Sequence, residues 1–91
     1  MASNYIWENP QTINFTTITA KTTASPAFTC TATTTLTPVT FVSNTPTICT
    51  VVLATGVVTM VGATGTGSIT ANQVGDHTYY PGTKTNTFAV T

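Results

Sequence analysis

Residues 27–35 read AFTCTATTT, a stretch in which threonine occupies every second position. Phe28, Cys30 and Ala32 fall on one face of an extended chain, and the intervening threonines fall on the other. An alternation with this period predicts a β-strand with one buried face. The branched Cβ of threonine favours extended backbone, while its hydroxyl suits the solvent face. We therefore expect residues 27–35 to form one strand that turns Phe28, Cys30 and Ala32 into the core.

The same alternation recurs on both sides of this stretch. The further predicted strands are QTINFT (11–16), PVTFVSN (38–44), ICTVVL (48–53), VVTMV (57–61), GSITANQ (67–73) and TNTFAVT (85–91). Their expected inward residues are Ile13, Phe15, Val39, Phe41, Ile69, Ala71, Phe88 and Val90. Turn formers separate the runs, such as Asn44-Thr45-Pro46, and Ala54-Thr55-Gly56 is expected to close a hairpin with Gly56 at positive φ.

Seven strands at intervals of about 8–12 residues, with no helical period, predict an all-β domain. The pattern favours an immunoglobulin-like antiparallel β-sandwich with Greek-key connections, and a small Greek-key barrel is the alternative. Trp7 precedes the first strand, so the Cys…Trp…Cys arrangement of antibody domains is absent. The length of 91 residues indicates one domain.

The chain is almost free of charge. Charged residues make up 4% of the sequence, against about 25% in ordinary domains. Glu8, Lys21, Asp76 and Lys84 cancel one another. Two lysines cannot neutralise a run of phosphates, so nucleic acid and an anionic membrane surface are not expected partners. Low net charge promotes association, so we expect many copies on a larger assembly.

No stretch of the sequence indicates secretion or chemistry. MASNYIWENP (1–10) lacks the basic and apolar regions of a signal peptide, and no apolar run is long enough to span a bilayer. Asp76 and His77 are adjacent, a spacing that does not give the geometry of a catalytic triad. One histidine, two acids and two distant cysteines offer no metal-ligand spacing. We expect no catalytic residue, no metal site, no cofactor and no enzyme activity.

From Gln11 onward the chain resembles the bacterial Ig-like (Big-type) repeats of surface and adhesin proteins. The similarity lies in QTINF (11–15), SPAFTCTATTT (25–35), PVTF (38–41), SNTPTICTV (43–51) and VVTMVGATGTGSITANQVGDHTYYPG (57–82). It implies a domain over residues 11–91, preceded by an N-terminal arm over residues 1–10. The family serves mostly as a spacer and display scaffold, so the resemblance implies a fold more sharply than a ligand.

The cysteines depart from the family pattern. Many such repeats pair a cysteine at the position of Cys49 with one at the position that Gly67 occupies here, so that bridge cannot form. Cys30 stands where the family has a core leucine. Two alternatives remain open: a new disulfide between Cys30 and Cys49, or two small buried apolar residues.

Aromatic residues are the candidate binding groups. Tyr79 matches a recurrent family tyrosine, which implies a packing role with its hydroxyl bonded to backbone at a sheet corner. Weak glycan binding by Tyr79 and Tyr80 is a second use. Tyr5, Ile6 and Trp7 lie in the arm, which is either an extension of the first strand or a partner-docking segment, since Trp and Tyr are typical interface anchors.

Two functions fit these expectations. The favoured one is a bacteriophage virion surface protein that decorates or cements the capsid or tail, its partner being a major capsid protein or another virion protein. Its localisation would be the virion. The alternative is a single spacer or adhesion module from a bacterial surface adhesin, located at the cell surface.

Overall fold

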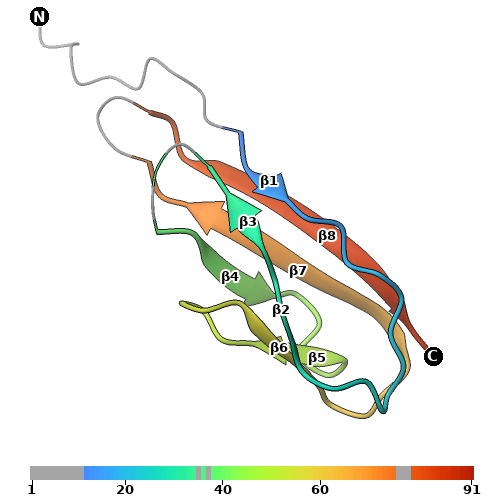
Figure 1. Ribbon diagram of the computed structural model, residues 1–91. Helices are drawn as coiled ribbons and strands as arrows, with labels where there is room; N and C mark the ends of the chain where they lie inside the picture. The colour runs from blue at the N-terminus through green and yellow to red at the C-terminus, as the bar shows by residue number, and fades with distance from the viewer. Residues whose placement is uncertain (1–11, 35, 37, 76–78) are drawn as a thin grey trace, which may run out of the picture.

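A computed structural model describes residues 12–34, 36, 38–75 and 79–91 (Figure 1). The N-terminal arm, with Tyr5, Ile6 and Trp7, lies outside the described residues, as do Asp76 and His77. The described chain is all-β and contains no helix. Its strands are β1 (Asn14–Phe15), β2 (Phe28–Thr29), β3 (Ala32–Thr33), β4 (Thr40–Ser43), β5 (Cys49–Val51), β6 (Val57–Met60), β7 (Gly65–Gln73) and β8 (Gly82–Val90).

The strands form three antiparallel sheets, in the orders β1-β3, β2-β6-β5 and β4-β7-β8. The longest pairing joins β7 to β8, from Gly65 opposite Val90 to Gln73 opposite Gly82. Figure 1 shows these two strands side by side along the molecule. The all-β prediction and the antiparallel pairing are thus confirmed.

The predicted strand over residues 27–35 is wrong as a single element, because it divides into β2 and β3, which belong to different sheets. The change of partner occurs at two neighbouring residues. The Cys30 N–H donates to the Gly56 carbonyl at 2.8 Å, toward the β6 side, whereas the Thr31 carbonyl accepts from the Thr16 N–H at 2.9 Å, toward the β1 side. The inward and outward faces are nevertheless as predicted, since Cys30 is buried while Thr29, Thr31 and Thr33 are exposed. This division gives eight strands in the described residues in place of about seven.

The predicted inward residues, together with Cys49 and Val58, which were not assigned to a face, supply one shared core. The residues buried in it are Ile13, Phe15, Cys30, Phe41, Cys49, Val58, Ile69, Ala71, Phe88 and Val90, with Val39 packed against them. The hairpin between β5 and β6 is also confirmed, and Gly56 in it has φ of 78°. Because residues from all three sheets contribute, burial of apolar surface holds these sheets together.

Two polar side chains connect separate parts of the fold. Gln73 is 3% exposed and donates from Nε2 to the Pro38 carbonyl at 2.7 Å, while its Oε1 accepts from the Gly75 N–H. Asn86 donates from Nδ2 to the carbonyls of Phe15, at 3.1 Å, and Thr16, at 2.9 Å. The first side chain fixes the segment before β4 against the end of β7, and the second fixes β1 against β8.

Candidate functional site

Two features of the described residues bear on chemistry, namely the grouping of metal-ligating side chains and the hydrogen bonding of buried polar atoms. No cluster of three or more His, Cys, Asp or Glu side chains occurs among them. Within the same residues, every buried side-chain nitrogen and oxygen has a hydrogen-bond partner. In this part of the chain, side chains such as Gln73 and Asn86 use their hydrogen bonds to connect separate segments of the fold.

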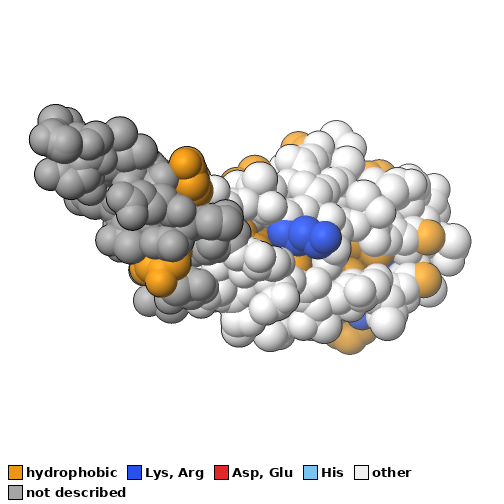
Figure 2. Space-filling model, turned by 90° about the horizontal axis from the view of Figure 1, so that it is seen from above, with side chains coloured by type: hydrophobic (Ala, Val, Ile, Leu, Met, Phe, Trp, Pro, Cys, Tyr) orange, Lys and Arg blue, Asp and Glu red, His pale blue; other side chains and the backbone are white. Residues whose placement is uncertain are grey.

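The solvent face of β7 and β8 is built from hydroxyl groups. The Thr70 and Thr85 hydroxyls lie 2.8 Å apart across the two strands, and Asn44 donates to the hydroxyls of Thr70, at 2.8 Å, and Ser68, at 3.0 Å. Among the described side chains visible on the face in Figure 2, lysine is the one charged type. Hydroxyl and amide groups therefore make the solvent face of β7 and β8 polar without making it charged.

Both cysteines are buried and free. This arrangement corresponds to the second alternative, in which the two cysteines are small buried core residues and form no disulfide. Cys49 faces Met60 in the β5–β6 register, and its Sγ lies 3.7 Å from the Ser43 hydroxyl and 3.8 Å from the Thr45 hydroxyl. Cys30 lies where the chain passes from β2 to β3. Burial, and secondarily the nearby Cys49, raises the pKa of the Cys30 thiol to about 11 from an ordinary value of 9.0. The thiolate is the reactive form, so Cys30 is inert at neutral pH.

The raised pKa of Cys30 predicts a loss of stability in alkali. The thiol of the unfolded chain ionises near pH 9, before that of the folded chain, so the unfolded state is favoured as the pH rises from 9 to about 11. Below pH 9 this contribution to stability is fully present. We expect the melting temperature to fall more steeply over this interval in the native sequence than in Cys30→Ala, which keeps every tyrosine and lysine. Parallel curves for the two proteins would contradict the assignment.

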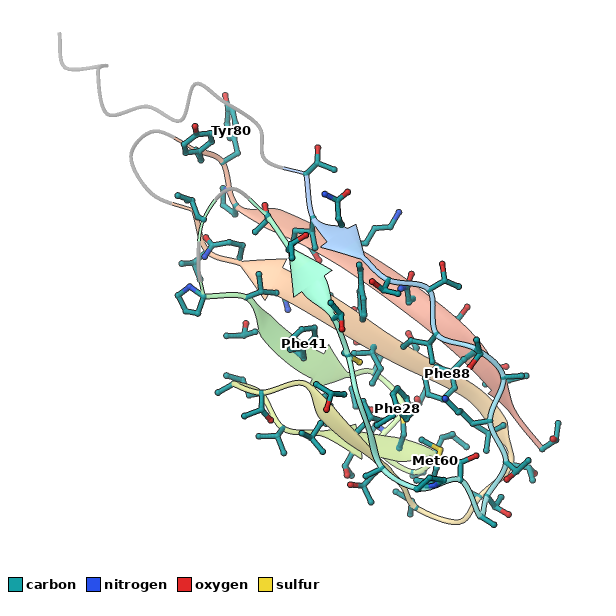
Figure 3. The ribbon with its side chains drawn as sticks, viewed as in Figure 1. Phe28, Phe41, Met60, Tyr80 and Phe88 are labelled. Atoms are coloured by element: carbon teal, nitrogen blue, oxygen red, sulfur yellow. The ribbon has the colours of Figure 1, made fainter. Side chains whose placement is uncertain are left out.

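The two described tyrosines lie just before β8. Tyr79 is half-buried, and the corner role that the resemblance implies for it remains a prediction. Tyr80 is 46% exposed and lies at the end of the molecule where β7 ends and β8 begins (Figure 3). Weak glycan binding by Tyr79 and Tyr80 likewise remains a prediction.

A groove of about 400 Å³ opens beside β3. The segment from Cys30 to Thr34 lines it together with Pro38, Val39 and Phe41. Ala54 and Thr55, from the turn between β5 and β6, close one side. Phe41 and Cys30 are both buried, so apolar core atoms form the floor. We call this feature the β3–β4 groove.

Charge distinguishes the β3–β4 groove from two other hollows of the described surface. A hollow of about 360 Å³ beside β1 includes Lys84, and one of about 220 Å³ includes Lys21. The Lys21 ammonium also lies 4.4 Å from the centre of the Phe28 ring, a cation–π contact. None of the described residues that line the β3–β4 groove carries a charge. Of the three, this groove is therefore the one suited to an apolar, uncharged occupant.

Comparison with protein-family models, curated proteins and solved structures finds no match to the chain. In the part of the chain that the structure describes, no helix has the length and hydropathy needed to cross a bilayer.

Sequence reasoning missed the groove and the two connecting amides. Gln73 continues the inward series of Ile69 and Ala71. A polar residue at a position that alternation predicts to be buried could have indicated a structural hydrogen bond. Asn86 likewise precedes Phe88 and Val90 on the inward face of β8. The sequence carried no such signal for the groove, because the groove forms where the chain passes from β2, in the sheet of β6, to β3, in the sheet of β1.

Proposed function

We propose that this protein is a non-catalytic structural or display protein, built as an immunoglobulin-like β-sandwich, that acts in many copies on a larger assembly. The observation that carries the proposal is the described surface: strands covered by hydroxyl and amide groups, with polar side chains bonded to one another. Such a surface binds through buried area and shape, and repetition over many copies multiplies weak contacts. The pairing orders β2-β6-β5 and β4-β7-β8 support the sandwich. Strands that follow one another in the sequence, such as β4 and β5, lie in different sheets, as they do in a Greek-key sandwich.

Within this class we favour a bacteriophage virion surface protein, on the capsid or the tail. A capsid or other virion protein is the proposed partner, contacted by Tyr5, Ile6 and Trp7 of the N-terminal arm. The near absence of charge supports permanent assembly, because a free protein at high concentration depends on charge for solubility. Recovery of this chain in many copies from purified phage particles would support the proposal.

The alternative is a spacer or adhesion module of a bacterial surface adhesin, which the resemblance to Big-type repeats favours. In that case the reading frame continues into further similar domains. Peptides of this chain would then be found in the cell-wall fraction and be missing from phage particles.

Deleting Met1–Asn9 is expected to abolish binding to the particle, because the deletion removes all three proposed anchors. A hot-spot residue contributes about 2 kcal/mol or more, so losing two aromatic anchors and Ile6 together leaves no measurable affinity. The melting temperature of dilute protein should change by only a few degrees. Co-sedimentation with particles and thermal unfolding by circular dichroism measure the two effects. A large loss of stability would show instead that the arm extends the first strand and belongs to the fold.

A further inference from the structure

The chain that follows β1 crosses from one sheet of the fold to another. At its start, the Thr16 N–H donates to the Thr31 carbonyl at 2.9 Å, beside β3. At its end, Lys21 forms a parallel bridge with Val90 of β8. Figure 1 shows this passage from β1 to the C-terminal end of β8. We call the crossing segment, residues 17–21, the strap.

Few backbone hydrogen bonds attach the strap to β8. The Lys21 N–H donates to the Ala89 carbonyl at 2.8 Å, and the Lys21 carbonyl accepts from the Thr91 N–H at 3.1 Å. Just past the strap, the Thr23 N–H donates to the Thr91 carbonyl at 3.1 Å. Within the described chain, no backbone hydrogen bond involves residues 17–20, which also belong to no strand. By contrast, the pairing of β7 with β8 extends over 9 residues of each strand.

Side chains of the strap add little to this attachment. Ile18 is partly buried and packs against the core, and the Lys21 ammonium lies 4.4 Å from the centre of the Phe28 ring. The three other residues of the strap are exposed. A hollow of about 220 Å³ is lined by the strap and by residues 28–31. Few buried apolar contacts and few backbone bonds are the features of a segment that opens before the rest of a fold.

The two flanks of the strap are held more firmly. Before it, Phe15 is 8% exposed, its ring packs edge-on against Phe41, and its carbonyl accepts from Asn86 Nδ2 at 3.1 Å. After it, the Thr22 N–H donates to the Ser25 hydroxyl at 2.9 Å, and the Ser25 N–H donates to the Thr22 carbonyl at 3.0 Å. The strap can therefore leave β8 while β1 and the turn after the strap keep their own contacts.

We propose that the strap opens as a separate unit while the rest of the domain stays folded, and that it is a removable cover on the outer edge of β8. Closed, it occupies the Ala89 carbonyl and the Thr91 N–H. Open, it leaves both groups unpaired and gives β8 a free edge at this end, and an unpaired edge is a template for an added strand. Opening breaks few backbone bonds and one partly buried apolar contact, so it costs less free energy than unfolding the core.

Residue-resolved amide hydrogen exchange of the full chain tests this inference. After correction for intrinsic rates, the Lys21 and Thr23 amides should exchange with a common protection, roughly 100-fold or more weaker than that of the amides joining β7 to β8. The Thr16 amide, which bonds to Thr31 outside the strap, is the internal control and should exchange much more slowly than Lys21. A Lys21 amide protected as strongly as β7 and β8, or exchanging together with Thr16, would overturn the proposal. So would a Lys21 amide without any protection, because the cover would then not be closed.

Two substitutions separate the strap from the body of the domain. Ile18→Ala truncates the side chain that packs against the core and should speed exchange of the Lys21 amide roughly tenfold. Thr19→Ala, at the exposed next position, is the matched control and should leave that exchange unchanged. Ile69→Val weakens the core of β7, which stays folded when the strap opens, so it should speed exchange between β7 and β8 about fivefold without affecting Lys21. A Lys21 amide that responds to Ile69→Val as β7 and β8 do would show that only unfolding of the whole domain exposes it, and would refute a separate strap.

Discussion

Replacing Phe41 with alanine is expected to lower the free energy of unfolding by about 3–5 kcal/mol, the usual cost of deleting a buried aromatic ring. Phe41 is 6% exposed and packs edge-on against Phe15, with ring centres 5.8 Å apart. It also lies over Gly56, where an added Cβ would stand 2.9 Å from Cε2 of the ring. The ring therefore joins β4 to β1 and to the β5–β6 hairpin, and its removal leaves a cavity beneath the β3–β4 groove. Denaturant unfolding measures the loss.

The neighbouring residue provides the control for Phe41. Val42 is on the same strand, points to the opposite face and is 43% exposed. Val42→Ala should change the free energy of unfolding by less than about 1 kcal/mol, as surface substitutions do. Equal losses for the two variants would show that the strand itself, and not the buried ring, limits stability at this position.

Gly67→Ala is expected to destabilise the fold by about 3 kcal/mol, at the upper end of the usual cost of overpacking. Gly67 lies opposite Phe88 in the β7–β8 register, and a Cβ at residue 67 would stand 2.4 Å from Cζ of the Phe88 ring. The ring cannot withdraw freely, because it packs edge-on against Phe28 with centres 5.9 Å apart and an angle of 86° between planes (Figure 3). The substitution thus disturbs the contact between β8 and β2 as well as the β7–β8 pair.

A double-mutant cycle isolates this clash. Phe88→Leu provides room beside residue 67, so Gly67→Ala in the Phe88→Leu background should cost much less than in the native sequence. Thr66→Ala is the matched single substitution, since Thr66 is the exposed neighbour on the same strand. Full additivity of the two changes would refute the proposed contact. The Phe88 ring also explains why glycine fits at residue 67, where any side chain would collide with the ring.

The sequence by itself determined which side of each strand is buried. Cys30, Phe41, Ile69 and Phe88 were placed in the core by an alternation of period two, and all are buried. This succeeds because strand geometry fixes the side-chain period locally, so the pattern needs no knowledge of the partner strand. The hairpin at Gly56 was predictable for the same reason, since positive φ is a local property of glycine.

Only the tertiary structure decided which strand edges are paired. The alternation in AFTCTATTT is unbroken, yet the backbone bonds to β6 at Cys30 and to β1 at Thr31. Side-chain pattern records which face is buried, whereas backbone hydrogen bonds lie in the plane of the sheet and carry no side-chain signature. The division into β2 and β3, and with it the β3–β4 groove, is therefore a property of how distant segments meet.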